Sequence, residues 1–363
     1  MAGTRRVFFE SWRGRYADSP RAISEYLAQN SDHQLHWVAT DPSQLPAGTS
    51  AVRRHSPDYF RRLLTCDYLI TNDIISKHLV KGPGVTYVQA WHGTPLKKIG
   101  LDETHASYSG AAKHLKRMVR DVCKWDYLIS PSPEASRIFR SAFDFQGPIL
   151  ETGYPRNDVL HSAEADSIRE RLRSRWDISG DQLVILYAPT WRDNSKDSEG
   201  RFRDPARLDL RAMGASLPPG TVLLNRMHSV VATQAPAENQ GNLRVLDVSS
   251  HPDIAELYLA ADVMISDYSS AVYDFAVTAK PIILFAYDLE SYRDAVRGMY
   301  FDYHDWAPGP IATDSEQVIA ELLALPNYAR DYAGRYGRFT ARFCPYEDGR
   351  ATARVVRAVF GLS

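Results

Sequence analysis

Residues 88–100, VQAWHGTPLKKIG, decide how the rest of the chain is interpreted. An apolar run, Val85–Trp91, ends abruptly at His92. Pro95 suits the first turn of a helix and Thr94 can cap it, so the pattern predicts a strand, a tight turn and a helix. His92 then lies at the carboxyl end of its strand, where ligands bind in open α/β sheets. Because histidine titrates near neutrality, it is interpreted either as a general base or as a structural turn residue.

Short apolar runs alternate with helical patterns along the chain, which indicates mostly parallel sheets with helices on both faces. Six strands are expected before residue 160, at Val7–Glu10, Leu35–Ala39, Asp67–Thr71, Val85–Trp91, Tyr127–Ser130 and Pro148–Thr152. After a helix over 163–177 the alternation restarts, with strands at Leu183–Tyr187, Val222–Arg226, Leu243–Asp247, Val263–Ser266 and Pro281–Phe285. The predicted fold class is α/β with two Rossmann-like units.

The length of 363 residues favours two domains over one core. We expect an N-terminal Rossmann-like domain over 1–160 and a second over 161–345, facing each other across a central cleft. Residues 346–363 are expected to form a C-terminal helix that packs back on the first domain.

The net charge of −1 is unevenly distributed, since residues 1–160 carry +5 and the remainder −6. A basic half suggests an anionic partner, such as phosphate, a membrane surface or nucleic acid. Three widely spaced cysteines argue against a disulfide framework or a structural zinc site and fit a reducing cytoplasm. Neither a signal peptide nor an apolar run of transmembrane length is present, so a membrane contact would be peripheral.

The segment 111–124 combines apolar residues at helical spacing with five lysines and arginines. Such a basic amphipathic helix can rest on an anionic membrane surface or hold an anionic polymer. The alternative is a solvated helix that packs on its own sheet.

The C-terminal half contains three strand-end loops suited to anions. They carry Arg192, then Arg226 with His228, then the hydroxyl-rich turn 266–270 that leads into a helix. Arginine forks and helix N-termini both favour phosphate, although each loop alone is more often a surface ion pair or a cap. Asp274 lies one turn inside the helix that follows 266–270, where it is expected to be within reach of a nucleotide ribose.

Several familiar signatures are absent from the sequence. It contains neither GxGxxG after the first strand nor GxxxxGK[ST], which counts against a dehydrogenase and a P-loop NTPase. It also lacks a metal-nucleotide DxD pair, HExxH and GxSxG, so neither a metal site nor a serine hydrolase is indicated.

Five ordered stretches resemble the CDP-glycerol glycerophosphotransferase family of teichoic acid primases and polymerases: WHGTPLKKIG, TGYPRND, YAPTWRD, RMH and SDYSSAVYDFAV. Residues 9–27 are similar to the family's opening, and the resemblance runs from about residue 5 to about 345. The resemblance implies the GT-B fold and a bacterial enzyme at the cytoplasmic face of the membrane. It also implies that the N-terminal lobe binds the acceptor and the C-terminal lobe binds the CDP-alditol. The implied reaction transfers glycerol phosphate, or another alditol phosphate, to an acceptor hydroxyl and releases CMP.

The resemblance implies catalytic roles for His92, as the base, and His228. Residues expected to bind donor and phosphate are Arg192, Arg226, Ser266, Ser269, Ser270 and Asp274. Those expected on the acceptor side are Gly93, Thr94, Lys97, Lys98 and Arg156, and the loop expected to contact cytosine is His251, Pro252, Asp253 and Ile254.

No cofactor is expected beyond the CDP-alditol donor, no metal site is assigned, and a divalent ion at most stimulates the reaction. The expected partners are a lipid-linked or polymeric anionic saccharide acceptor and, through 111–124, an anionic membrane surface; nucleic acid is not expected. Two alternatives stay open, a GT-B glycosyltransferase that uses a nucleotide sugar and a non-catalytic scaffold for envelope assembly. The sequence does not distinguish a glycerol donor from a ribitol donor, or a primase from a polymerase. It also does not identify the acceptor or the oligomeric state.

Overall fold

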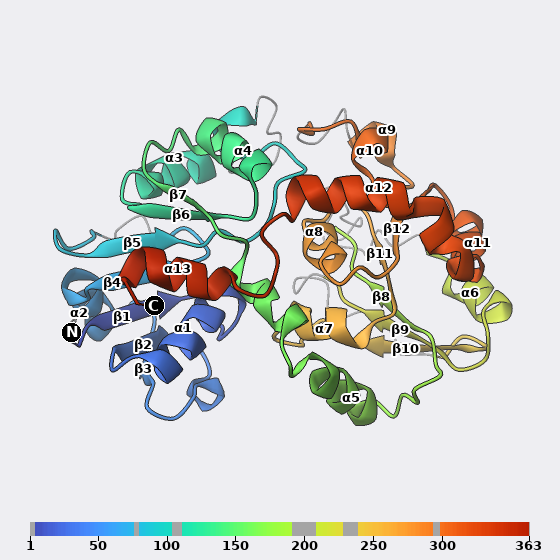
Figure 1. The fold of residues 1–363 in the computed structure, drawn as a ribbon, viewed down its shortest axis with the longest axis horizontal. Helices are drawn as coiled ribbons and strands as arrows, with labels where there is room; N and C mark the ends of the chain where they lie inside the picture. Colours follow the sequence, from blue (N-terminus) through green and yellow to red (C-terminus); the bar gives the residue numbers. More distant parts are fainter. Residues whose placement is uncertain are drawn as a thin grey trace, which may run out of the picture.

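The computed structural model describes residues 4–75, 80–103, 111–190, 208–227, 239–292 and 298–362. In this part of the chain, two parallel sheets build two lobes that lie side by side (Figure 1). The strand order is β3-β2-β1-β4-β5-β6-β7 in the N-terminal sheet and β10-β9-β8-β11-β12-β13 in the C-terminal sheet. The alternation of strands and helices predicted from the sequence therefore produces two Rossmann-like units.

The N-terminal sheet consists of β1 (Arg6–Glu10), β2 (Gln34–Val38), β3 (Ser50–Val52), β4 (Tyr68–Thr71), β5 (Thr86–Gln89), β6 (Tyr127–Ser130) and β7 (Ile149–Glu151). One face is covered by α2 (Pro57–Thr65), α3 (Ala111–Val122) and α4 (Pro133–Phe143). The other face is covered by α1 (Asp18–Asn30) and α13 (Ala351–Phe360). With both faces buried, the central strands are continuous apolar runs, which is why they were recognisable in the sequence.

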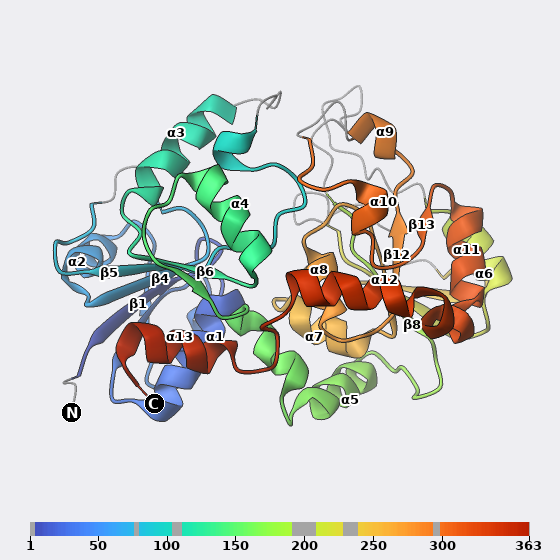
Figure 2. The ribbon, with the colours of Figure 1, turned by 45° about the horizontal axis from the view of Figure 1, so that its top comes forward.

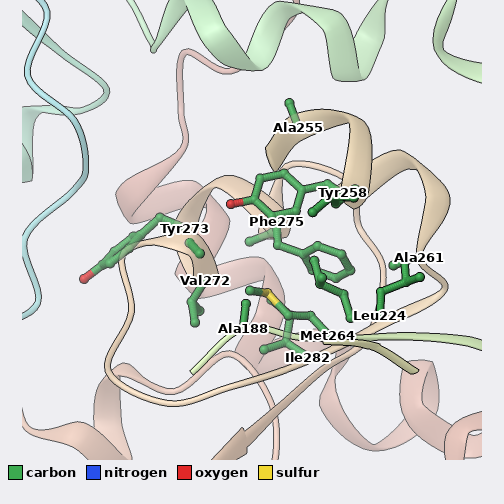
Figure 3. Packing of buried hydrophobic residues seen from close by; sticks show 14 of the residues in the cluster. Ala188, Leu224, Ala255, Tyr258, Ala261, Met264, Val272, Tyr273, Phe275 and Ile282 are labelled. Carbon is green, nitrogen blue, oxygen red and sulfur yellow. The ribbon is translucent and has the colours of Figure 1, made fainter. Parts of the chain in front are cut away.

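The C-terminal sheet consists of β8 (Val184–Tyr187), β9 (Thr221–Asn225), β10 (Leu243–Asp247), β11 (Val263–Ser266), β12 (Ile282–Phe285) and β13 (Ile311–Ala312). Around it lie α5 (Ala165–Arg175), α6 (Leu210–Ser216), α7 (Ile254–Ala260), α8 (Ala271–Ala276), α9 (Leu289–Tyr292), α10 (Tyr303–Trp306), α11 (Ser315–Leu323) and α12 (Tyr328–Phe343). In its core, Tyr258 and Phe275 pack over Met264 and Ile282 (Figure 3). None of the helices in the described ranges is both long and apolar enough to cross a bilayer.

The prediction of a helix after Pro95 is wrong. The chain stays extended there and bonds to the other lobe: Tyr300 N donates to the Leu96 carbonyl at 2.9 Å, and Lys98 N donates to the Gly298 carbonyl at 3.1 Å. Leu96 is buried among the core residues of the C-terminal lobe. Local signals suited a helix, but backbone partners from the second lobe satisfy this segment instead.

The end of the chain crosses back from α12 to the first lobe, where α13 lies against α1 (Figure 2). The Asp158 carboxylate accepts bonds from Ala351 N and Thr352 N at 2.9 and 2.7 Å, which satisfies free amides at the start of α13. Gly153 adopts φ +81°, and a Cβ there would lie 2.6 Å from the Tyr346 carbonyl oxygen. Only glycine therefore permits the returning segment to pass this close.

A buried carboxyl group, Glu347, lies where the returning segment meets the first lobe. Its Oε1 accepts a bond from Tyr154 N at 2.9 Å, while its Oε2 lacks a hydrogen-bond partner among the described residues. Burial, with a smaller contribution from the nearby Asp274 carboxylate, raises the pKa of Glu347 from 4.5 to about 8. Glu347 is therefore protonated in the folded protein over most of the physiological range.

We expect stability to depend on pH through Glu347. Because its folded-state pKa lies above its unfolded value, its stabilising contribution is complete below pH 4.5 and is lost as pH rises through about 8. The neutral variant Glu347→Gln removes this loss, so the difference in free energy of unfolding between variant and parent should grow between these pH values. Urea titrations across the range measure it. Glu151→Gln, at an exposed carboxyl in β7, serves as the control, and parallel curves for E347Q and the parent would contradict the assignment.

Candidate functional site

His92 follows β5 at the carboxyl edge of the N-terminal sheet. Its Nδ1 lies 2.7 Å from the Asn72 carbonyl oxygen. A carbonyl only accepts hydrogen bonds, so Nδ1 carries the proton and the lone pair is on Nε2. In the neutral form of the ring, this arrangement leaves Nε2 as the nitrogen that can accept a proton, and the Asn72 carbonyl would stabilise the imidazolium formed by proton uptake.

Two tryptophans hold the imidazole of His92. The Trp91 ring stacks on it with centroids 4.3 Å apart, and the Trp12 ring lies 5.0 Å away. Trp12 Nε1 donates to Asp18 at 3.1 Å, and Trp12 N donates to the Asn72 side chain at 3.2 Å. Trp12, Asp18 and Trp91 all have positive φ, between 45° and 64°. Such backbone conformations cost free energy and concentrate at functional sites.

The loop after β5 meets the C-terminal lobe at Ser270. A Cβ on Gly93 would lie 2.5 Å from the Ser270 Oγ and 2.7 Å from its Cβ, so this position accommodates only glycine without movement. The site residues predicted on the two lobes therefore adjoin directly at this point. Ser269 and Ser270 are both partly exposed, and the Ser269 hydroxyl accepts a bond from Ala271 N at 3.2 Å.

Arg156 and Asp274 do not have the ligand-facing positions expected from the sequence. They form one buried ion pair, in which Arg156 Nη2 lies 3.0 Å from Asp274 Oδ1, and Asn157 donates to the same oxygen at 3.1 Å. Arg156 Nη1 also contacts Asp18 at 3.2 Å. The Asp274 carboxylate is thus saturated by protein donors rather than free for a ribose, and Arg156 joins the lobes rather than guiding an acceptor.

Arg226 retains a cationic group that is not neutralised by a described carboxylate. Its Nη1 donates to two backbone carbonyls, those of His251 at 2.9 Å and Val248 at 3.3 Å. Burial lowers the pKa of Arg226. Tyr258 and Asp253 act in the opposite direction, and the Arg15 guanidinium of the opposite lobe lowers the pKa further. The charges of Arg226 and Arg15, which come from different lobes, are thus close enough to interact, and two such cations favour an anion between them.

Other predicted donor contacts are partly occupied by the protein. The Ser266 hydroxyl is buried and donates to the Ala188 carbonyl at 2.7 Å, so it is not available to phosphate. In the loop 251–254, the His251 amide donates to Val248 and its carbonyl accepts from Arg226. Asp253 bonds to Ala255 N and pairs with Arg21 of the first lobe. For a base contact, this loop offers only the remaining backbone groups of Pro252, Asp253 and Ile254.

On the acceptor side, Thr94 is buried, whereas Lys97 and Lys98 are half-buried within the strand-like contact between the lobes. Arg192 and His228 lie outside the described residues. No group of three or more His, Cys, Asp or Glu side chains in the described ranges is placed to hold a metal ion.

Sequence reasoning missed Trp12, Arg15, Asp18 and Asn72 as site residues. The signal was present, because 11–18 and 72–75 follow β1 and β4 at the same carboxyl edge as His92. What the pattern could not indicate was that Trp12 contacts the imidazole, since that depends on how strongly the turn after β1 bends.

Comparison with known proteins gives a consistent result. The sequence profile described as CDP-Glycerol:Poly(glycerophosphate) glycerophosphotransferase matches residues 3–361. The chain is 37% identical to a teichoic acid poly(glycerol phosphate) polymerase of Bacillus spizizenii, over 98% of this chain and 92% of the relative. It is also 37% identical to a teichoic acid glycerol-phosphate transferase of Staphylococcus aureus, with the same two coverages.

Among solved structures, the wall teichoic acid polymerase TagF superposes with a TM-score of 0.89 at 32% identity, covering 98% of this chain and 89% of TagF. The predictions of the family and of the two-lobed GT-B fold are thereby confirmed.

We expect Asp274→Asn to destabilise the protein by about 3 kcal/mol or more, because it leaves the buried Arg156 without its main countercharge. Urea unfolding measures the loss. Asp67→Asn is the control, since Asp67 pairs with Arg5 and Arg6 at the surface, where the cost should stay near 1 kcal/mol or less. The double variant Arg156→Met/Asp274→Leu should recover much of the stability. An Asp274→Asn variant of unchanged stability but raised KM for the nucleotide substrate would restore the ribose-binding role.

Proposed function

The chain belongs to the CDP-glycerol:poly(glycerophosphate) glycerophosphotransferase family, and from this premise we propose how its residues perform the transfer. As an enzyme of this family it moves glycerol phosphate from CDP-glycerol to an acceptor hydroxyl in teichoic acid synthesis and releases CMP. The observation that carries the proposal is the orientation of His92 beside the Gly93–Ser270 contact between the lobes. The Asn72 carbonyl holds Nδ1, and no described residue bonds to Nε2.

In the proposed reaction, the acceptor hydroxyl oxygen attacks the phosphorus that carries glycerol. His92 Nε2 takes the hydroxyl proton, the bond from that phosphorus to the CMP oxygen breaks, and CMP leaves. Such a transfer depends on alignment and on stabilising charge at the phosphoryl oxygens more than on covalent catalysis. The Asn72 carbonyl and the two tryptophans align the base.

The donor diphosphate would lie between Arg226 and Arg15, which supply positive charge from the two lobes. Arg192 and His228 keep the phosphate and leaving-group roles expected from the sequence, and Lys97 and Lys98 remain candidates for the anionic acceptor. We propose CDP-glycerol as the donor because the two relatives compared above act on glycerol phosphate. No further cofactor enters this proposal, and a divalent ion would only stimulate; activity after EDTA treatment tests that.

We expect His92→Ala to lower kcat by at least about 100-fold, the usual contribution of a general base. CMP release from CDP-glycerol with a defined acceptor measures it. His161→Ala is the control, because it removes the same kind of side chain at an exposed position that has no role in the proposed reaction. A near-normal rate in His92→Ala would exclude His92 as the base, whereas absence of CMP release from the parent protein would favour a non-catalytic scaffold. Release of UDP from a nucleotide sugar without release of CMP would favour the glycosyltransferase alternative.

The proposed location is the cytoplasmic face of the membrane, with α3 on the lipid surface and a lipid-linked or polymeric saccharide as acceptor. Met118 and Val122 of α3 face the core, while Lys113, Lys116 and Arg120 are exposed. Exposed apolar side chains on or near helices covering the same sheet face, Phe60, Leu64, Val80 and Val119, add to this surface. Basic and apolar groups together suit an anionic bilayer.

We expect Lys116→Glu/Arg120→Glu to reduce flotation with anionic vesicles at low salt, because two attractive charges become repulsive. Arg330→Glu/Arg338→Glu on α12 makes the same charge change on the other lobe and should leave flotation unaltered. Vesicle flotation at low and high salt measures both. Equal binding of the parent protein to neutral and anionic vesicles would contradict an electrostatic contact.

A further inference from the structure

A second cationic site lies at the edge of the N-terminal sheet opposite His92. A cavity of about 220 Å³ opens where β1 and β2 begin and α2 ends. Its lining consists of Arg6, Gln34, His36, Arg61, Arg62, Thr65 and Cys66. The two sites lie at opposite ends of β1: Arg6 begins the strand, and Trp12, which contacts His92, follows its end. At about 3.3 Å per residue, Arg6 and Trp12 are at most roughly 20 Å apart.

His36 is the first indication that this cavity takes a ligand. The residue is only 8% exposed, and neither of its ring nitrogens has a hydrogen-bond partner in the described part of the chain. Buried polar groups are nearly always bonded, because an unpaired one costs free energy. Burial is the main cause that lowers the pKa of His36 to about 4; Arg62, Arg6 and Arg61 act in the same direction, and Asp58 opposes them. Near pH 7 the ring is therefore neutral and offers one N–H.

The charges around the cavity are the second indication. Arg5 and Arg6 share Asp67, at 3.4 Å each. Arg61 and Arg62 share Asp58, at 2.5 and 2.8 Å. Arg6, Arg61 and Arg62 line the cavity, and these three guanidinium groups share two carboxylates, one of them also with Arg5 outside the cavity. The lining therefore carries an excess of positive charge. Guanidinium groups only donate hydrogen bonds and match phosphate oxygens well.

We propose that this cavity binds a phosphodiester group of the poly(glycerol phosphate) acceptor, several repeats away from the hydroxyl that reacts at His92. The proposal rests on the proposed function for the identity of the chain. Arg6 and Arg61 form a rim whose side chains are 50% and 67% exposed, so a chain can enter and continue past the cavity. The neutral His36 donates to a phosphate oxygen, and the rim arginines supply the countercharge.

A linear polymer suits this site better than a lipid headgroup. On α2, Arg61, Arg62 and Thr65 line the cavity. The exposed apolar residues Phe60 and Leu64 point on average about 130° away from these three around the helix, by its 3.6-residue period. A bilayer that inserted Phe60 and Leu64 would leave the cavity turned away from it. A soluble anionic chain has no such constraint.

The consequence is a dependence on acceptor length. A long acceptor reaches both sites, whereas a single-unit acceptor occupies only the site at His92. We expect Arg6→Gln/Arg61→Gln to raise KM for the long acceptor about tenfold, as for the loss of charged hydrogen bonds. kcat, and KM for the single-unit acceptor, should stay unchanged.

The control variant is Arg5→Gln/Arg137→Gln. Arg5 shares Asp67 with Arg6 but lies outside the cavity, and Arg137 on α4 is as exposed as Arg61, in an (i, i+3) pair of the same kind. This variant removes the same charge and should keep the parent's length dependence. His36→Phe should lose the length dependence without lowering the melting temperature, since it removes an unbonded polar ring.

Direct binding is tested without turnover. Inorganic phosphate should raise the pKa of His36, followed by NMR of its ring protons, in the parent and not in Arg6→Gln/Arg61→Gln. An unaltered His36 titration in phosphate would overturn the site even if transfer proceeds. A pKa rise in a protein that transfers no glycerol phosphate would instead refute the proposed function. Two results with Arg6→Gln/Arg61→Gln would refute the polymer as ligand. One is an equal rise in KM for long and short acceptors, and the other is weaker binding to phosphatidylglycerol vesicles with no change in KM.

Discussion

The ion pair between Arg156 and Asp274 is the interaction on which the two-lobed arrangement depends. The guanidinium comes from the segment that links the lobes, Asp274 from α8 of the second lobe, and a further partner, Asp18, from α1 of the first. All three groups are withdrawn from water, so each needs the others to offset its desolvation. A rotation of the lobes that separated them would leave a buried charge unpaired, which is a strong restraint on how α1 and α8 are placed.

The same restraint extends to His92, the proposed base. Asp18 accepts a bond from Trp12 Nε1, and Trp12 packs against the His92 ring. The positive φ angles at Trp12 and Asp18 are sustained only because these contacts hold the turn after β1 in place. The position of the base in the first lobe is therefore coupled through Asp18 and Arg156 to α8 in the second. A residue far from the transferred phosphate can influence the reaction by this route.

The sequence predicted what depends on local pattern and missed what depends on partners. Buried strands such as β5 and β11 appear as apolar runs, but β3 and β13, short strands at the sheet edges, lack such a run. Pro95 has the local signature of a helix start, yet its neighbours bond to residues two hundred positions away. Similarly, strand-end position identified Asp274 and Arg156 as functional candidates. That the two would neutralise each other is a property of the assembled lobes.

The distribution of charge explains how such an assembly can still attract an anionic donor. The lobes carry opposite net charges, which favours their association, and the carboxylates at the junction are used by Arg156 and Arg21. The Arg15 guanidinium acts on Arg226 across this junction and lowers its pKa, which is a repulsion between the two cations. An anion between them removes that repulsion, so the donor diphosphate of the proposed reaction would favour the lobe arrangement in which His92 adjoins Ser270. Donor binding and assembly of the site would then stabilise each other, since whichever state binds the ligand better gains population.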